Sequence, residues 1–423
     1  MLHVRNGRAD SLELAGRVVA PAQGIDDCLR IEVRDGVIAA IEPAEASSLV
    51  LAPAFVDPHV HLRTPGREDE ETIASGTAAA AAGGYCAILA MPNTDPVVDS
   101  APVLEVLAAR ATSEAAVPTG FMAAISKGQH GEELSEMAEL AASGAVAFTD
   151  DGRPVASAAL LRNALRYGAL AGRPLALHEE EPTLSRGGHA HEGAVSAELG
   201  VGPYPSAAES LMVERDLALA HLEERPVHLM HLSAKESVDA LRRARAAGVP
   251  ATAEVTPHHL CLTDEAVRSL DPNVKMNPPL RADADRAALV DALRDGTIDA
   301  VATDHAPHAR HEKDVPFEEA PFGVTGLETS FSVLFTRLVE PGILLLETLL
   351  ERMSQGPARI FGLPEPRIEV GARANLVVLD LDAEWEVTEA GFRSRSANSW
   401  LLGQTLRSRV VTTVADGRVV FGA

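Results

Sequence analysis

The chain has 423 residues, of which 46% are hydrophobic and 23% charged, so we expect a globular protein with one large and one smaller domain. A formal net charge of −24 excludes nucleic acid and membrane surfaces as main partners, because both require a cationic face. The N-terminus carries charges where an export signal needs an apolar block, which favours a cytoplasmic location. Three widely spaced cysteines argue against a disulfide framework.

Alternating apolar residues predict short strands at both ends of the chain. Asp35-Gly36 and Asp416-Gly417 are typical hairpin turns within these regions. The predicted strands are Leu12–Val19, Leu29–Val33, Val37–Ile41, Leu376–Leu381, Val410–Val414 and Val419–Phe421. Neither half can bury a sheet face alone. We therefore predict one small β-sandwich domain, assembled from residues 1–50 and 369–423.

The region between them alternates short apolar runs with alanine-rich helical patterns. The expected strands are Leu51–Val56, Tyr85–Met91, Val117–Ile125, Ala145–Thr149, Pro174–Leu177, Pro226–Met230, Val249–Val255 and Ile298–Thr303. The expected helices are Thr72–Ala82, Leu134–Ser143, Ala158–Ala171, Ala207–Glu223, Ala234–Ala247 and Asp283–Arg294. This order is typical of the α/β class and predicts a (β/α)₈ TIM barrel over residues 51–368. The uncharged stretch 73–93 contains Gly83-Gly84, so we predict a helix and a strand there, not a membrane span.

Two histidines follow the first predicted barrel strand. In an extended chain His59 and His61 leave the same face, ~7 Å apart, so both can bind one metal ion. Arg63 follows on that face and indicates an anionic substrate. In a barrel the other strand ends converge on the same face.

Six strand-end residues can bind a divalent ion: His59, His61, Asp151, His178, His231 and Asp304. Six ligands exceed one tetrahedral ion, so we predict two Zn²⁺ ions bridged by Asp151. The first ion takes His59, His61 and Asp304, and the second takes His178 and His231. A water molecule between two such ions becomes a nucleophile near neutral pH.

Two alternatives stay open at this stage. Asp150 competes with Asp151 for the bridging position, because spacing does not separate them. His258 and His259 follow another predicted strand, but we favour a supporting role for them over a ligand role.

Seven motifs in order resemble the dihydroorotase family of the amidohydrolase superfamily, and the likeness spans almost the whole chain. They are DPHVHLR at 57–63, AMPNT at 90–94, FTDDG at 148–152, LHE at 177–179, MHLS at 230–233, MNPPLR at 276–281 and ATDHAPH at 302–308. Related hydantoinases, dihydropyrimidinases and allantoinases bridge their metals with a carboxylated lysine. None of the four lysines here lies at the end of strand 4, where Asp151 stands. This favours the bacterial dihydroorotase type.

The resemblance implies the reversible cyclisation of N-carbamoyl-L-aspartate to L-dihydroorotate, a step of pyrimidine synthesis. In ring opening, an activated water attacks a ring carbonyl, and Asp304 transfers its proton to the departing amide nitrogen. The substrate carboxylate would be bound by Arg63, with Asn93 and His308 beside it. The resemblance further implies substrate contacts from His61, Asn277 and the backbone at Phe322 and Gly323. The alternative role for Arg63 is a surface ion pair, and the alternative role for Asn93 is that of a turn former.

Residues 308–323 are polar and adjoin the predicted site, so we expect a covering loop there. We expect a homodimer, because two-fold assemblies predominate, and an aspartate transcarbamoylase partner remains open. Two other functions compete with dihydroorotase: another cyclic amidohydrolase, and an inactive scaffold for the transcarbamoylase. Retention of all six ligands argues against the scaffold.

Overall fold

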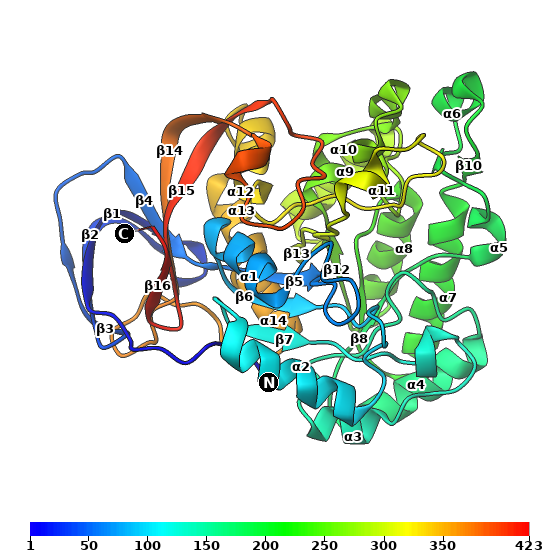
Figure 1. Ribbon diagram of the computed structural model, residues 1–423, viewed down its shortest axis with the longest axis horizontal. Coiled ribbons are helices and arrows are strands. Elements are labelled where there is room, and N and C mark those ends of the chain that lie inside the picture. Colours follow the sequence, from blue (N-terminus) through cyan, green and yellow to red (C-terminus); the bar gives the residue numbers. More distant parts are fainter. Residues whose placement is uncertain (423) are drawn as a thin grey trace.

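A computed structural model describes residues 1–422, and both chain ends contribute to one mixed sheet (Figure 1). Its strands are β1 (Leu12–Ala20), β2 (Ile25–Arg34), β3 (Val37–Pro43), β4 (Leu49–Pro53), β14 (Leu376–Glu386), β15 (Thr405–Ala415) and β16 (Arg418–Phe421). The spatial order is β16-β15-β14-β4-β1-β2-β3. Strand β4 joins the halves, because Val50 lies opposite Arg17 of β1 and Leu379 of β14. Strands from both chain ends thus lie in one sheet, and the β-sandwich domain with its predicted bounds stays a prediction.

The two predicted hairpin turns occur as expected. Asp35 and Gly36 have φ values of 49° and 77°, and Asp416 and Gly417 have 46° and 69°. Asp-Gly pairs tolerate this left-handed conformation, which matches the twist of the flanking strands. Strand pairing gives one seven-stranded sheet and does not by itself establish two stacked layers.

The predicted strand Leu51–Val56 is wrong in its bounds, because this apolar run divides between two sheets. Strand β4 ends at Pro53 in the terminal sheet, and β5 (Phe55–Val60) begins the central region. The amide of Phe55 already bonds to the carbonyl of Gly84, 2.9 Å away. A continuously buried run contains no polar residue to mark such a change of partner, so periodicity could not detect it.

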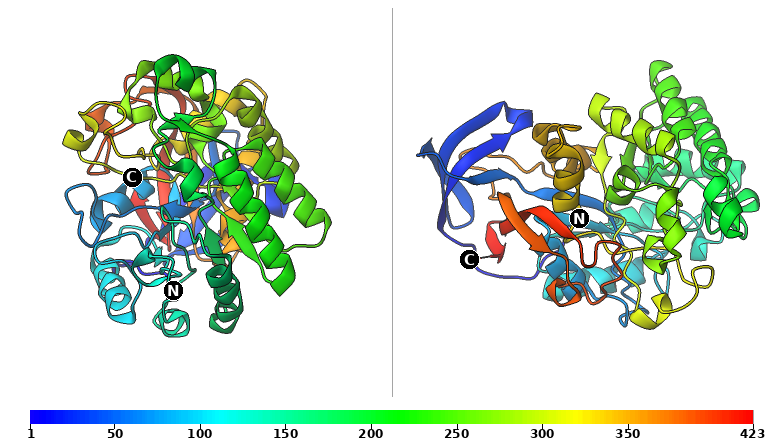
Figure 2. Two further views of the ribbon diagram at one scale, coloured as in Figure 1. Left: turned by 90° about the vertical axis from the view of Figure 1, so that its right-hand side faces the viewer. Right: turned by 90° about the horizontal axis from the view of Figure 1, so that it is seen from above.

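The central region contains two parallel sheets, of three and four strands (Figures 1 and 2). The first sheet has β5, β6 (Tyr85–Ala90) and β7 (Thr119–Phe121). The second has β8 (Leu175–Leu177), β11 (Val227–Leu229), β12 (Ala251–Val255) and β13 (Ala300–Val301). Single parallel bridges link the sheets: Phe148 pairs with Ala123 and Leu175, and Val60 pairs with His305. The predicted strand Ala145–Thr149 is reduced to the bridging residue Phe148.

Helices surround these parallel strands, and the alanine-rich patterns located many of them. Helices α4 (Ala158–Ala171) and α7 (Ala207–Glu223) have the predicted bounds. The others are α1 (Ile73–Ala82), α2 (Ala101–Glu114), α3 (Met137–Ala142), α5 (Pro182–Ser185), α6 (Ala194–Leu199), α8 (Lys235–Ala246), α9 (Pro257–Cys261), α10 (Asp283–Asp295), α11 (Arg310–Lys313), α12 (Ser330–Leu334), α13 (Leu346–Met353) and α14 (Gln355–Ile360). Two short strands, β9 (Ala190–His191) and β10 (Pro203–Tyr204), pair with each other. Among residues 1–422, no helix is long and apolar enough to cross a membrane.

The joint between α1 and β6 requires a glycine for steric reasons. A Cβ atom on Gly83 would lie 2.1 Å from the carbonyl oxygen of Leu327, and backbone cannot move away cheaply. Gly168 in α4 is the matched control, since a Cβ there meets its nearest atoms at 3.4 Å.

We expect Gly83→Ala to lower the free energy of unfolding by about 1–3 kcal/mol, as overpacking does. Gly168→Ala should be neutral or stabilising by up to about 1 kcal/mol, because alanine favours helix. Denaturant titration of both variants checks this. Equal stability of Gly83→Ala and the wild type would contradict the packing described here.

Candidate metal centre and substrate site

The six predicted ligands converge, and each lies at or just beyond the carboxyl end of a parallel strand or bridge. His59 lies within β5, His61 follows it, and Asp151 follows the bridging residue Phe148. His178, His231 and Asp304 follow β8, β11 and β13, respectively. All six side chains are buried. The prediction that these strand ends meet is therefore correct.

The Asp151 carboxylate lies at the centre of four imidazoles. Its Oδ1 atom is 3.6 Å from His59 Nε2, 3.5 Å from His178 Nδ1 and 3.6 Å from His231 Nε2. Its Oδ2 atom is 3.5 Å from His61 Nε2. These separations are too long for hydrogen bonds. They match the spacing of about 3.4 Å between two ligands that share a tetrahedral ion at about 2.1 Å.

Two imidazole nitrogen atoms in this cluster, His59 Nε2 and His231 Nδ1, lack within the described residues the partners that buried polar atoms need. His59 Nε2 is buried and forms no hydrogen bond with any part of the chain that the structure describes. His178 Nδ1 and His231 Nε2 face each other at 2.9 Å. The donor sets His59/His61/Asp151 and Asp151/His178/His231 could each hold a metal ion. Imidazole and carboxylate donors suit a divalent cation, so the residues fit the metal that the sequence predicted.

Asp304 lies against the first of these sets. Its Oδ1 atom is 3.1 Å from His61 Nε2 and 3.4 Å from His59 Nε2. Burial opposes ionisation, but the charge of His59 and the hydrogen bond from His61 outweigh it and lower the pKa of Asp304. The pKa of Asp151 is also lowered, because the charge of His59 and the adjacent His178 and His231 imidazoles outweigh its burial. Both carboxylates are thus ionised acceptors at neutral pH.

The imidazole rings are oriented by further polar side chains. Glu254 Oε1 lies 2.8 Å from His59 Nδ1, and Glu254 Oε2 lies 3.0 Å from His228 Nε2. Asn93 Oδ1 is 2.9 Å from His61 Nδ1. Such partners hold a ligand histidine in one tautomer and orientation. Asn93, predicted to contact substrate, therefore also supports a candidate ligand.

The geometry separates Asp150 from Asp151. Asp150 Oδ1 accepts hydrogen bonds from the backbone amides of Ile125 (2.8 Å) and Ser126 (3.1 Å), and Oδ2 accepts one from the Ser126 hydroxyl. It therefore anchors the loop after β7. Only Asp151 faces the histidines.

His258 and His259 both lie in α9. His259 bonds to the Thr256 hydroxyl (2.8 Å) and the Pro278 carbonyl (3.0 Å), which supports the structural role favoured for it.

Arg63 is a partly buried ion-pair partner instead of the surface one considered as an alternative. Its Nε atom is 2.8 Å from Glu70 Oε2 and donates to the Pro307 carbonyl at 3.1 Å. One terminal nitrogen lies 3.3 Å from His308 Nε2. Arg63 and His308 are thus brought together as predicted. Glu70 orients the guanidinium group and neutralises part of its positive charge.

The remaining predicted substrate residues surround this group. Asn277 donates to Glu180 Oε2 (2.9 Å), which also contacts His178 Nε2 (2.9 Å), so Asn277 is linked to the cluster. The Phe322 carbonyl accepts from His308 Nε2 at 2.8 Å and so is already engaged. The Gly323 amide bonds to the Lys275 carbonyl (2.8 Å), and so is also engaged.

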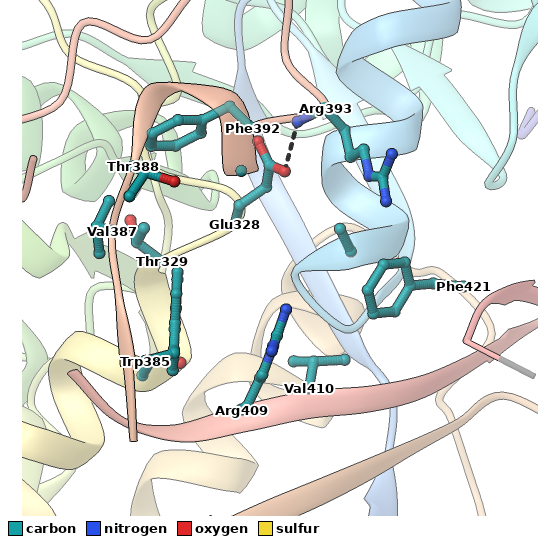
Figure 3. A pocket seen from close by; sticks show the side chains of 13 residues that line it. Glu328, Thr329, Trp385, Val387, Thr388, Phe392, Arg393, Arg409, Val410 and Phe421 are labelled. Atoms are coloured by element: carbon teal, nitrogen blue, oxygen red, sulfur yellow. Dashed lines mark hydrogen bonds between the residues drawn. The ribbon is translucent and has the colours of Figure 1, made fainter. Parts of the chain in front are cut away.

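The protein has a cavity beside the predicted substrate residue His308 and another one away from the metal cluster. One of about 710 Å³ borders His308, Lys313 and Asn398. The other, of about 80 Å³, lies between the terminal sheet and the helices (Figure 3). There the half-buried Glu328 carboxylate accepts a hydrogen bond from the Arg393 amide at 2.7 Å. The smaller cavity is lined by none of the predicted site residues, so it is separate from the metal cluster.

Comparison with known proteins identifies the family. The dihydro-orotase-like family model matches residues 48–237. The dihydroorotase of Anaeromyxobacter dehalogenans strain 2CP-1 is 46% identical over 417 residues, which cover 96% of each chain. That of Geobacter metallireducens is 44% identical over 96% of this chain and 98% of its own. The chain belongs to the dihydroorotase family. It is an enzyme, a cyclic amide hydrolase.

Solved structures agree on the superfamily fold. The L-hydantoinase (dihydropyrimidinase) of Arthrobacter aurescens superposes with a TM-score of 0.85 at 25% identity, covering 100% of this chain and 96% of that one. A D-hydantoinase from a Thermus species gives a TM-score of 0.79 at 23% identity, over 96% and 93% of the two chains. The mixed α/β fold is therefore that of the cyclic amidohydrolases.

Sequence reasoning missed several residues that shape this dihydroorotase-family site. Glu254 stands inside an apolar strand, and a carboxylate in such a run is a signal that could have been noticed. Glu180 lies two residues after His178, in the acidic run 179–181, and could have been considered as a hydrogen-bond partner of that histidine. Lys275 and Asn398 carry no such signal, because their partners come from distant parts of the chain. Glu70 lies only seven residues after its partner Arg63, in a run of acidic residues that does not mark it out.

The two adjacent aspartates give a matched test of the candidate metal centre. Asp151→Asn should lower divalent-metal affinity about ten- to hundredfold or more, because a central charged donor is lost. Asp150→Asn should keep the metal but lower the free energy of unfolding by about 1–3 kcal/mol, since its charged acceptor is lost. Metal analysis and thermal unfolding of both variants measure this. Loss of metal from the Asp150 variant alone would reverse the assignment.

Proposed function

We propose that this family member is a zinc-dependent dihydroorotase, which interconverts N-carbamoyl-L-aspartate and L-dihydroorotate. His59, His61 and Asp304 would hold one zinc ion, and His178 and His231 a second, with Asp151 shared between them. The two donor sets that meet at Asp151 support this arrangement. The cytoplasmic location, the homodimer and the aspartate transcarbamoylase partner stay predictions.

The position of Asp151 among the histidines is the observation that favours dihydroorotase over the lysine-bridged cyclic amidases. A lysine-bridged cyclic amidase requires a lysine among the histidines, and all four lysines here lie elsewhere. Lys127 pairs with Glu133, Lys235 is exposed, and Lys275 and Lys313 bind backbone carbonyl groups. An aspartate in place of the carboxylated lysine is the feature by which the motifs resemble bacterial dihydroorotases more than hydantoinases.

Asp304 is the proposed proton carrier. When bound, the metal ions would lower the pKa of a water molecule and polarise a ring carbonyl. In ring opening, water adds to the carbonyl carbon, the C–N bond breaks, and Asp304 delivers to the nitrogen the proton it took from that water. Cyclisation reverses these transfers. Its contacts with His59 and His61 keep the Asp304 carboxylate ionised and ready to accept a proton.

Arg63 is the proposed partner of the substrate carboxylate. The guanidinium offers five donors in a planar fork, and Glu70, Pro307 and His308 fix its orientation. A protein with a net charge of −24 repels an anion at long range, so a local cation is needed, and Arg63 supplies one in a partly buried position. Asn93, Asn277 and His308 would complete the substrate site, together with the Phe322–Gly323 backbone, where the Phe322 amide is the group not already engaged among the described hydrogen bonds.

The architecture we propose for this function is a closed (β/α)₈ barrel over residues 51–368 with a β-sandwich domain from residues 1–50 and 369–423. The bridges at Phe148 and between Val60 and His305 support closure, because they connect both ends of the two parallel sheets. A shared apolar cluster supports the sandwich. It joins Ile31 and Ile38 of β2 and β3 with Leu376 and Val414 of β14 and β15.

The test of this function is a substrate panel with zinc present. We expect the protein to convert L-dihydroorotate to N-carbamoyl-L-aspartate and to turn over hydantoin, dihydrouracil and allantoin far more slowly. The fold similarity to hydantoinases makes those compounds the appropriate competitors. Turnover of hydantoin without turnover of dihydroorotate would replace the proposal with a hydantoinase function.

Asp304→Asn tests the proton carrier. The amide cannot accept the proton, so we expect kcat to fall by about 10²–10⁴-fold. Metal content measured on the same sample distinguishes loss of proton transfer from loss of a ligand. A kcat near that of the wild type would remove Asp304 from the mechanism.

Arg63→Met tests the carboxylate contact. We expect kcat/KM for L-dihydroorotate to fall about ten- to hundredfold, the effect of losing a hydrogen-bonded charge pair. The control is Arg268→Met, because Arg268 pairs with Glu265 and Glu198 at the surface. Equal steady-state kinetics for the two variants would argue that Arg63 serves only its ion pair with Glu70.

A further inference from the structure

Two buried lysines bind the backbone of the covering loop, residues 308–323. Lys275 lies outside the loop, and its Nζ atom donates to the carbonyl oxygens of Phe317 (2.8 Å), Glu318 (3.0 Å) and Ala320 (2.7 Å). An ammonium group has three N–H donors, so these bonds use all of them. Lys275 thus holds the middle of the loop.

Lys313 makes the reciprocal connection from within the loop. Its Nζ atom donates to the carbonyl oxygens of Pro272 (3.0 Å) and Pro321 (2.8 Å). Pro272 precedes Lys275 by three residues, so both lysines join the same two segments of chain. One side chain reaches into the loop and the other reaches out of it.

The acceptors are neutral carbonyl groups. Neither ammonium forms an ion pair with a carboxylate in the described part of the chain, and the two residues are only 2% and 8% exposed. Burial lowers the pKa of Lys275 to about 8, and burial together with the Lys275 charge lowers that of Lys313 to about 7. An apolar side chain would avoid this desolvation but would leave the carbonyl groups without donors.

Contacts lead from Lys275 to the substrate site. The Lys275 carbonyl accepts from the Gly323 amide at 2.8 Å, and its Nζ atom lies 4.7 Å from the centre of the Phe322 ring. The Phe322 carbonyl accepts from His308 Nε2 at 2.8 Å. That nitrogen is 3.3 Å from the guanidinium of Arg63.

Asn398 secures the same loop from the C-terminal segment. Its side-chain amide donates to the carbonyls of Ala306 (3.1 Å) and Gly323 (3.2 Å), and its Oδ1 atom accepts from the His308 amide (3.0 Å). The start of the loop and the Gly323 backbone are thus held together independently of the lysines. The lysines determine the path of the chain between these points.

We propose that Lys275 and Lys313 are positioning residues for the substrate: by binding the carbonyl groups of the covering loop, they place His308 and the Phe322–Gly323 backbone beside Arg63. The inference rests on the proposed function, because the ligand of that group is the carboxylate of L-dihydroorotate. Neither lysine touches the reacting atoms. Their loss should therefore weaken substrate binding and leave the chemical step largely intact.

The experiment compares Lys275→Met and Lys313→Met with Lys235→Met, since Lys235 is exposed at the start of α8. We expect KM for L-dihydroorotate to rise about tenfold or more in the first two variants, with kcat within about threefold of the wild type. Metal content should not change. Hydrogen exchange should become faster in residues 314–323 and stay slow in the parallel strands. Lys235→Met should match the wild type.

Lys275→Gln and Lys313→Gln retain part of the hydrogen bonding and should show a smaller rise in KM. They also provide folded material if the methionine variants are unstable. An unchanged KM together with faster exchange in residues 314–323 would overturn the positioning role, as would a fall in kcat at constant KM. If the wild type did not hydrolyse L-dihydroorotate, the proposed function would fail. In that case, unchanged hydrogen exchange in residues 314–323 of the Lys275 and Lys313 variants would still refute the proposal that these lysines hold the loop.

Discussion

The buried Asp151 carboxylate is the constraint on which the site depends. Four imidazoles from three parts of the chain face it at 3.5–3.6 Å, and all of these side chains are buried. Unpaired polar atoms at such depth cost free energy, and His59 Nε2 has no partner within residues 1–422. A divalent cation satisfies these donors together. The parallel strands are therefore needed mainly to bring ligands that are distant in sequence to one point.

A second layer of polar contacts maintains that arrangement. Glu254 orients His59, Asn93 orients His61, and Glu180 contacts His178. On the substrate side, Glu70 and His308 hold Arg63, while Lys275 and Lys313 bind the loop that carries His308. The candidate ligands and the candidate substrate contacts are thus both held by hydrogen-bonded neighbours, as preorganised sites require.

Much of the fold and of the candidate site could be predicted from the sequence, because the relevant signals are local. Alanine-rich helical patterns located α4 and α7, and residues at the carboxyl ends of the barrel strands converge on one face. Long-range pairing was not predictable. The run around Pro53 changes sheets without a polar break, and Phe148 pairs with two neighbours without forming a regular strand.

Other features are invisible to residue patterns for a different reason. The choice between Asp150 and Asp151 depends on which carboxylate turns toward the amides of Ile125 and Ser126. The partners of Lys275 are backbone carbonyls, which every residue carries, so no motif marks them. These positions became recognisable only once distances were known.

The central claim is that Asp151 joins two metal ions, and anomalous diffraction at the zinc absorption edge from crystals of the zinc-loaded protein tests it most directly. We expect two peaks about 3.5–4 Å apart, as in other two-metal sites, with Asp151 between them and Asp150 bonded to backbone amides. A single peak, or a pair of peaks joined by a group other than Asp151, would contradict it.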